Sequence, residues 1–546
     1  MRRATLAGTA AAVLAALTAA GCGKEAPGTA NGDGTSATRP TELSATTPPP
    51  TRDVDRITWA LYREVGTLDP IQAFDYPENT VVTALCESLQ RQQPDGSITP
   101  GLATLSHPDD TTLVIKLRDG VRFWDGTPVT AEDVAFSLRR AADPAAGSFY
   151  SAVFSRVRSI TPTAGDEVTV ELEQPDYWLD GELSGMPGVV IQKAHAEAQG
   201  RRLGTPSGGI MCTGAYELDA WKAGADLTVV RNDDYWDAEH RAKVARIDFK
   251  GVPDDASTTT GLLTGEIDGT YPTGLGSMEQ LEASPKVTVS YGPSFAMDAI
   301  VISNLDGVLG DVRVRRALSM ALDRQAYIDE VWHGAGQLPR NLSNPGMWGY
   351  ARDVFRADWD ELPDPAYDVE RAKRLIEEAG ATGKTVTLGM TAEVSNLNSL
   401  ANAFRAAGEA IGLEVRFKAV SAQNFINFFT DPKAREGVDG FPTVNYPDYA
   451  DPAAFYNQFV TKEGFQNYSG FSDPKITKAL DAARATADPE RRARHVVEAG
   501  DRIAEQLPWI PAAALDSVVI TSSDLTGAPS SFVYMGGPWA NLLGGT

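Results

Sequence analysis

Several features are scarce in this sequence of 546 residues, and each absence excludes a class of function. Only five histidines are present, and none has a metal-site spacing such as His-x-x-x-His. Lys and Arg number 49 against 73 Asp and Glu, and the net charge of −24 argues against nucleic acid and against direct electrostatic binding to anionic lipid. No apolar run after Cys22 approaches the length that spans a bilayer.

Catalytic and nucleotide-binding motifs are also missing. There is no Gly-x-Ser-x-Gly elbow, and nothing else assembles a nucleophile or an acid–base pair. Residues 380–385, Gly-Ala-Thr-Gly-Lys-Thr, come near a phosphate-binding P-loop, but Glu378 stands where the first Gly belongs and the segment follows a predicted helix. We interpret it as a helix end and turn, and we expect neither an enzyme nor a cofactor.

The N-terminal segment has the pattern of an export signal. Arg2 and Arg3 are its only charges, and a mostly small and apolar stretch leads to Cys22. Residues 19–22, Ala-Ala-Gly-Cys, resemble a bacterial lipobox, although Leu is more usual at the first position. Under this interpretation residues 1–22 are a lipoprotein signal peptide and Cys22 is lipidated. The alternative is an ordinary secretory signal that is cleaved nearby.

Composition divides the rest of the chain in two. Residues 23–53 are Gly, Ala, Thr, Ser and Pro with almost no large apolar residue, so we predict a disordered tether. Its random-coil span is ~30 Å and its extended reach is about 100 Å. Residues 54–546 are too long for one hydrophobic core and should divide into lobes.

Two cysteines remain after lipidation, Cys86 and Cys212. An even pair in an exported protein can form a disulfide, and its loop of about 126 residues would stabilise the fold by ~4–5 kcal/mol. The alternative is two buried thiols that never meet. The sequence leaves both open, because it does not give the Cα separation.

Residues 94–134 carry the most informative motifs. They predict a strand pair with Gly turns and then a helix opened by a capping box, with Thr130 at the N-cap and Asp133 at N3. Residues 100–103, 117–123 and 125–134 resemble solute-binding protein family 5, the extracytoplasmic receptors of ABC importers for peptides, nickel and some oligosaccharides. Further blocks follow in the family's order across nearly all of the chain after the tether.

The resemblance implies a two-lobe α/β fold of the periplasmic-binding-protein type (type II, the large peptide-binder form), with a ligand cleft between the lobes. Two segments would cross between lobes, near residues 291–302 and 511–520. Lobe one would comprise residues 54–290 with the C-terminal residues 515–546, and lobe two residues 291–514.

The resemblance also implies ligand contacts. Residues 445–452, Asn-Tyr-Pro-Asp-Tyr-Ala-Asp-Pro, match the family element Trp-x-Ala-Asp-Tyr-x-Asp-Pro, whose first Asp receives the ligand's α-ammonium in peptide-binding members. Position for position this is Asp448, and a charge-assisted contact in a closed cleft would select a free amino terminus. Alternatively, Asp448 only caps a turn. The other candidate ligand contacts are Asn445 (where Trp is usual), Tyr446, Tyr449 and, at a position that faces the cleft in oligopeptide binders, Glu64.

Dipeptide-selective relatives hold the ligand's carboxylate with an Arg near the start of a lobe-two helix. The corresponding residues 393–399 contain no Arg, so we expect longer peptides rather than dipeptides.

Taken together, the resemblance implies a monomeric receptor, lipid-anchored on the outer face of the cytoplasmic membrane in the periplasmic space or its equivalent. It would capture an oligopeptide and deliver it to an ABC permease driven by partner ATPase subunits. No metal, cofactor or nucleic acid is expected, and the membrane would be contacted through the lipid anchor only. The alternatives are an oligosaccharide or metal-chelate ligand and, more remotely, a secreted hydrolase, against which the missing nucleophile argues.

Overall fold

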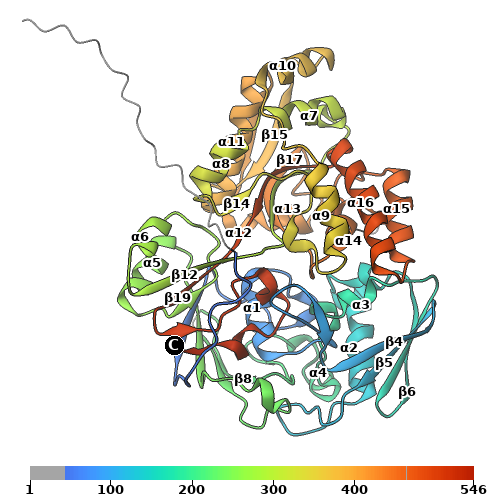
Figure 1. Cartoon of the computed structure of the whole chain (residues 1–546), viewed down its shortest axis with the longest axis vertical. Coiled ribbons are helices and arrows are strands. Elements are labelled where there is room, and N and C mark those ends of the chain that lie inside the picture. The colour runs from blue at the N-terminus through green and yellow to red at the C-terminus, as the bar shows by residue number, and fades with distance from the viewer. Residues whose placement is uncertain (1–42, 225, 463) are drawn as a thin grey trace, which may run out of the picture. The chain divides into compact units, whose positions relative to one another are not determined.

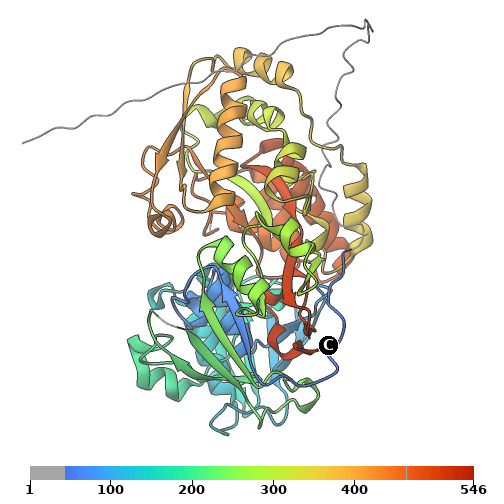
Figure 2. The same cartoon turned by 90° about the vertical axis from the view of Figure 1, so that its left-hand side faces the viewer.

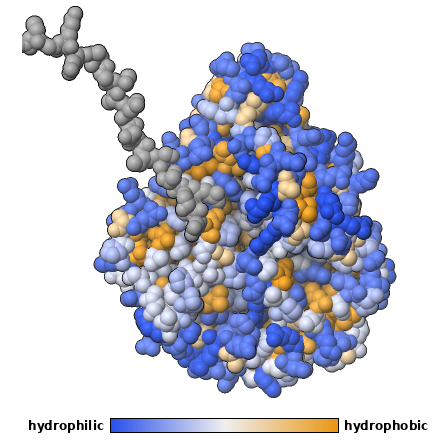
Figure 3. Space-filling model, viewed as in Figure 1, coloured by the Kyte–Doolittle hydropathy of each residue, from blue (hydrophilic) through white to orange (hydrophobic). Residues whose placement is uncertain are grey.

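The computed structural model describes residues 43–224, 226–462 and 464–546 (Figure 1). The predicted signal peptide, the lipidation site Cys22 and most of the predicted tether lie outside these residues. Within the described ranges, none of the helices combines the length and the apolar character needed to traverse a bilayer. Hydrophilic residues predominate on the face seen in Figure 3, and apolar residues there form small separate groups.

Lobe one is built on a seven-stranded mixed sheet. Its strands, in spatial order, are β12 (Val287–Gly292), β19 (Ser517–Ser522), β11 (Gly269–Thr270), β1 (Ile57–Leu61), β10 (Arg246–Gly251), β9 (Leu227–Arg231) and β8 (Tyr216–Trp221). β1 pairs in parallel with β10 and β11, and the other neighbours are antiparallel. The buried ring of Trp59 on β1 lies 4.5 Å from that of Trp539, so the C-terminal segment packs against lobe one.

A second, antiparallel sheet completes lobe one. Its strands, in spatial order, are β4 (Ala103–Asp109), β5 (Thr112–Leu117), β7 (Glu167–Leu172) and β6 (Val157–Ala164). Helix α2 (Ala131–Ala142) packs on it and begins with the predicted capping box, which is confirmed: Asp133 N donates to Thr130 Oγ1 at 3.3 Å and Thr130 N to Asp133 Oδ2 at 3.0 Å. Val134, Leu138 and Ala141 on this helix are buried in a separate apolar cluster.

The remaining elements of lobe one are short. A short hairpin is formed by β2 (Gln90–Gln92) and β3 (Ile98–Pro100), and the strand pair predicted within residues 94–134 is that of β4 with β5. The helices are α1 (Tyr76–Leu85), α3 (Leu179–Glu182), α4 (Lys193–Gln199), α5 (Asp255–Thr264) and α6 (Met278–Glu282).

Lobe two is built on a six-stranded mixed sheet. Its strands, in spatial order, are β14 (Gly336–Gln337), β18 (Trp509–Leu515), β13 (Met297–Ile302), β17 (Gly440–Asn445), β15 (Thr385–Met390) and β16 (Glu414–Ala419). Strand β13 is antiparallel to both of its neighbours, whereas β15 is parallel to both β16 and β17.

Helices surround this second sheet. They are α7 (Val312–Ala321), α8 (Arg324–Val331), α9 (Arg352–Glu361), α10 (Val369–Glu378), α11 (Ser395–Ala410), α12 (Ala422–Phe425), α13 (Asn427–Thr430), α14 (Pro452–Val460), α15 (Pro474–Arg484) and α16 (Pro489–Gln506). Helices α15 and α16 lie side by side (Figure 1). After α10, Gly380 takes a left-handed φ of 62° and the chain turns into β15. The P-loop-like segment is therefore a helix end and turn, as predicted.

The chain passes between the two large sheets twice. It runs from β12 to β13 through residues 293–296, and from β18 to β19 through residue 516; both passages lie within the segments 291–302 and 511–520. Because β12 pairs with β19 and β13 with β18, the two passages form one antiparallel ribbon that belongs to both sheets (Figures 1 and 2).

The described end of the predicted tether is hydrogen bonded to the folded body. Ser44 N donates to Tyr291 O at 3.0 Å, Thr47 N to Ala528 O at 3.1 Å, and Thr51 N to Gly545 O at 2.9 Å. Ordered structure therefore begins no later than Ser44, before the expected tether end at residue 53. The sequence does not indicate this, because the contacts use backbone groups and need no apolar side chain.

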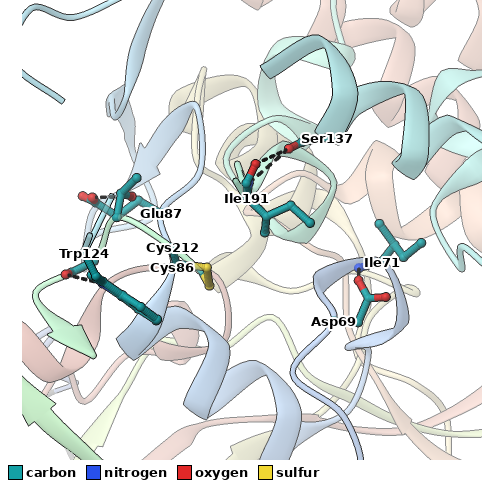
Figure 4. Close-up of a disulfide and its surroundings, with 10 residues drawn as sticks. Asp69, Ile71, Cys86, Glu87, Trp124, Ser137, Ile191 and Cys212 are labelled. Atoms are coloured by element: carbon teal, nitrogen blue, oxygen red, sulfur yellow. Dashed lines mark hydrogen bonds between the residues drawn. A yellow bond between two sulfur atoms is a disulfide. The ribbon is translucent and has the colours of Figure 1, made fainter. Parts of the chain in front are cut away.

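Cys86 and Cys212 form a disulfide with a Cα–Cα distance of 4.9 Å (Figure 4). Cys86 follows the end of α1, and the disulfide lies beside the buried Glu87. The Glu87 carboxylate accepts hydrogen bonds from Thr213 Oγ1 at 2.9 Å and from the side chains of Tyr235 at 2.7 Å and Trp236 at 2.8 Å. The bridge thus joins α1 to the segment that leads into β8.

We predict that replacing both cysteines by alanine lowers the free energy of unfolding by ~2–5 kcal/mol, because the bridge closes a long loop and restricts the unfolded chain. Denaturant unfolding of the wild type and the double variant measures the difference. Intact mass after alkylation, with and without reductant, is the control. Two thiols that alkylate freely without reductant under denaturing conditions would contradict the pairing.

Candidate ligand-binding site

The segment of residues 445–452 forms the loop between β17 and α14. Strand β17 ends at Asn445, and α14 begins at Pro452 with Asp451 as its N-cap. The Asp451 carboxylate accepts a hydrogen bond from Ala453 N at 2.8 Å, and proline suits the first helical position because the N–H it lacks has no helical partner there. Both ends of the loop are thereby fixed in lobe two.

Asn445 supports this loop from inside lobe two. Its side-chain amide donates to Gln458 Oε1 at 3.1 Å and also to Gln466. Gln458 in turn donates to Tyr446 O at 3.1 Å. In this structure the Asn445 amide is thus engaged by lobe two itself.

Tyr446 and Tyr449 contact lobe one. The Tyr446 hydroxyl donates to Phe74 O at 3.1 Å. The Tyr449 hydroxyl lies 3.5 Å from the carbonyl oxygen of Trp178. A Cβ atom at Gly181 would lie 2.2 Å from the Tyr449 ring, so the helix turn of α3 can approach this closely only because residue 181 is glycine.

Asp448 lies at the same junction, with its side chain partly buried. Its backbone carbonyl accepts a hydrogen bond from Gln92 Nε2 of lobe one at 2.8 Å. Among the residues that the structure describes, no group donates a hydrogen bond to its carboxylate. Burial raises the pKa of Asp448 to about 7, because the charged form loses its hydration and gains no partner.

A second carboxylate, Glu182 at the end of α3, approaches Asp448 from lobe one. The residue is only 8% exposed, and its Oε2 has no hydrogen-bond partner among the described residues. Burial, and next the charge of Asp448, raise the pKa of Glu182 well above its ordinary value. Burial, with smaller contributions from the same two carboxylates, also raises the pKa of the Tyr150 hydroxyl. The junction therefore gathers acidic groups.

Glu64 has a different environment. It lies in the loop after β1, it is exposed, and its Oε2 accepts a hydrogen bond from Gly224 N at 3.0 Å. In the described part of the chain, none of its hydrogen bonds or ion pairs reaches residues 445–452. The structure therefore brings Asp448, Tyr446 and Tyr449 to the lobe junction, whereas the Glu64 side chain is hydrogen bonded to Gly224.

An aromatic recess adjoins the junction. Its volume is about 10 Å³, room for about one water molecule, and its aromatic lining comes from Trp59, Tyr62, Tyr76, Tyr271 and Tyr534. The Tyr76 ring lies 5.3 Å from the ring of Tyr446.

Sequence patterns do not single out Gln92, Tyr150 or Glu182. The contact between Gln92 and Asp448 spans 356 residues, so no local pattern encodes it. For Glu182 the available signal is the pair of glycines that flank it, Gly181 and Gly185, since both permit close approach to residues 448 and 449.

Two α/β lobes on a shared ribbon, with unpaired acidic groups where they meet, define a bilobal solute-binding protein. The chain belongs to the bacterial extracellular solute-binding proteins, family 5, since the family 5 Middle model matches residues 97–467.

Relatives with assigned names agree with this membership. The chain is 28% identical over 477 residues to the periplasmic murein peptide-binding protein MppA of Escherichia coli K12, covering 82% of this chain and 85% of MppA. It is 26% identical over 472 residues to the periplasmic oligopeptide-binding protein OppA of Salmonella typhimurium, again covering 82% and 85%.

A solved structure supports the fold. The ABC transporter-associated periplasmic binding protein DppA from Helicobacter pylori, in complex with peptide STSA, matches with a TM-score of 0.79 and 21% sequence identity. The match covers 90% of this chain and 98% of DppA, so it includes both lobes.

The raised pKa of Asp448 predicts that the ligand-free protein loses stability as pH rises. The ordinary pKa of this carboxyl group is 3.8 and its pKa in the folded protein is about 7, so it binds its proton more tightly when folded. Its stabilising contribution is complete below about pH 4 and is lost as pH rises through 7. The unfolding free energy of the Asp448→Asn variant should therefore be larger than that of the wild type by ~1–4 kcal/mol at pH 8 and by little at pH 4.

Urea unfolding at both pH values measures this difference. Asp360→Asn, at an exposed position on α9, is the control. Its unfolding free energy should differ from that of the wild type by the same small amount at both pH values. A difference for Asp448→Asn that does not change between pH 4 and pH 8 would contradict the burial of an unpaired carboxyl group.

Proposed function

We propose that this protein is the substrate-binding receptor of an ABC importer and that it captures oligopeptides outside the cell by their free amino terminus. The observation that carries the proposal is the carboxylate of Asp448, which lies where the lobes meet and has no donor among the described residues. A peptide ammonium supplies a positive charge and three N–H donors, so it would satisfy this carboxylate in the closed cleft.

The names of the relatives favour the same ligand class. MppA is a murein peptide-binding protein and OppA an oligopeptide-binding protein, and each is matched over 85% of its length. The absence of Arg from residues 393–399 favours peptides longer than two residues, because no fixed cation holds a carboxylate there.

Closure and delivery follow from the two-lobe fold. The bodies that close would be residues 54–290 with 515–546, and residues 291–514. A peptide that contacts both lobes shifts the population toward the closed form. The loaded receptor, acting as a monomer, would then be recognised by an ABC permease, and partner ATPase subunits would hydrolyse the ATP.

Lipid anchoring through Cys22 is the second part of the proposal, and it is supported by the sequence Ala-Ala-Gly-Cys at residues 19–22. Two or more acyl chains would hold the receptor stably at the outer face of the cytoplasmic membrane. We predict that the wild type partitions into the detergent phase and that Cys22→Ser is recovered uncleaved or in the aqueous phase. Phase partitioning with intact mass decides this, and a wild type of mature mass without lipid would contradict it.

The ligand proposal predicts a specific loss of affinity. Breaking one partner of a buried ion pair costs ~2–5 kcal/mol, so Asp448→Asn should weaken binding of alanine peptides of three to six residues by about 30-fold or more. N-acetylation of the same peptides should lower their affinity for the wild type by a similar factor. It should lower their affinity for the variant much less, because the pair is already broken. Calorimetry measures the affinity of the wild type and of the variant for free and for acetylated peptides.

Asp451→Asn is the matched control, three residues away. Asn retains an N-cap for α14, so this variant should bind free peptides nearly as well as the wild type. Equal affinity of the wild type for free and acetylated peptides would contradict recognition of the amino terminus. Thermal stabilisation by cello-oligosaccharides or nickel chelates, and not by peptides, would favour the other ligand classes.

A further inference from the structure

We infer that Glu182 of lobe one is a second carboxylate for the ligand's cationic group, placed opposite Asp448 of lobe two, so that one ammonium ion is held by both lobes. This inference rests on the proposed function, since it assigns a further residue to the same ammonium. It predicts that a free amine stabilises the closed form of the protein as well as adding affinity.

The first argument is position. Glu182 lies between Gly181, against which the Tyr449 ring packs, and Gly185. A Cβ atom on Gly185 would lie 3.4 Å from Cβ of Asp448. The turn of chain that carries Glu182 therefore lies directly against residues 448 and 449, with one glycine contact on each side of the glutamate.

The second argument is the missing partner. The Glu182 side chain is more than nine-tenths buried, and its Oε2 accepts no hydrogen bond from any described residue. A buried polar group without a partner is costly, and natural folds leave few such groups unless a ligand, ion or water completes them. Among the charges that act on Glu182, the strongest is that of Asp448, which is another unpaired carboxylate.

The neighbouring cation is already committed elsewhere. Arg484 at the end of α15 lies near Glu182, but its guanidinium makes a bidentate ion pair with Asp176, with Nε 2.7 Å from Oδ1. Burial and then the charge of Asp448 raise the pKa of Glu182, and the charge of Arg484 lowers it by less. Asp448 and Glu182 are therefore two carboxyl groups at this junction that form no ion pair with a described residue.

An ammonium ion between the two carboxylates would remove this imbalance. Two like charges that approach each other in a dry site favour a shared proton when no cation is present. A ligand ammonium can replace that proton and donate to both side chains at once. Because Asp448 and Glu182 come from different lobes, this arrangement requires that the cleft be closed.

The test compares Glu182→Gln with Asp180→Asn. Both replace one carboxyl group on α3 by an amide, but the Asp180 carboxylate is paired with His107 at 2.9 Å. The probes are alanine peptides of three to six residues, free and N-acetylated, measured by calorimetry. We expect Glu182→Gln to weaken the binding of free peptides at least 10-fold and that of acetylated peptides less than 3-fold. We expect Asp180→Asn to change neither affinity by more than 3-fold.

A purely structural role for Glu182 gives a different result. In that case Glu182→Gln would weaken the binding of free and acetylated peptides by the same factor, or would weaken the binding of neither. Either result would overturn the inference. The double variant with Asp448→Asn should lose less than the product of the two single effects, because both residues hold one ammonium. Should Glu182→Gln fail to fold, Glu182→Met of similar volume takes the same test.

The two proposals fail in distinguishable ways. If the wild type binds acetylated and free peptides equally, or binds neither, the proposed recognition of the amino terminus fails and the Glu182 role fails with it. If the wild type prefers free peptides and Asp448→Asn abolishes that preference while Glu182→Gln keeps it, only the Glu182 inference is overturned.

Discussion

One antiparallel ribbon constrains the whole structure, because β12 with β19 and β13 with β18 belong to the two large sheets at once. Neither lobe can slide along the other without breaking backbone hydrogen bonds in a sheet. Rotation about the short connections at residues 293–296 and 516 is the movement that keeps both sheets intact. A buried side chain also ties the ribbon to lobe two: Asp298 on β13 accepts hydrogen bonds from Tyr327 and, at 3.1 Å, from Trp332.

The features that the sequence could predict are those with local causes. The capping box of Thr130 and Asp133 and the turn at Gly380 each depend on residues within one helical turn. The element of residues 445–452 was identified through the family resemblance, and in the structure it is the loop between a strand end and a capped helix.

Tertiary contacts account for what the sequence could not predict. Asn445 was a candidate ligand contact because of its position in the motif, yet its amide is engaged by Gln458 and Gln466. Glu182 carries no motif, and its environment exists only because lobe two packs against α3. The ordered backbone from Ser44 depends on Tyr291 and on partners near the C-terminus, the latter about 480 residues away.

Under the proposed function, opposing electrostatic contributions at the lobe junction would govern whether the cleft is closed. The ion pair of Arg484 with Asp176 joins the lobes, and both side chains are nearly or fully buried, so it favours the closed form once the cost of desolvating both charges has been met. Asp448 and Glu182 oppose it, because closing brings two unpaired carboxylates together and removes their water. A ligand cation between the carboxylates would cancel the opposing contribution and leave the Arg484 pair intact, so closure would come to depend on the ligand.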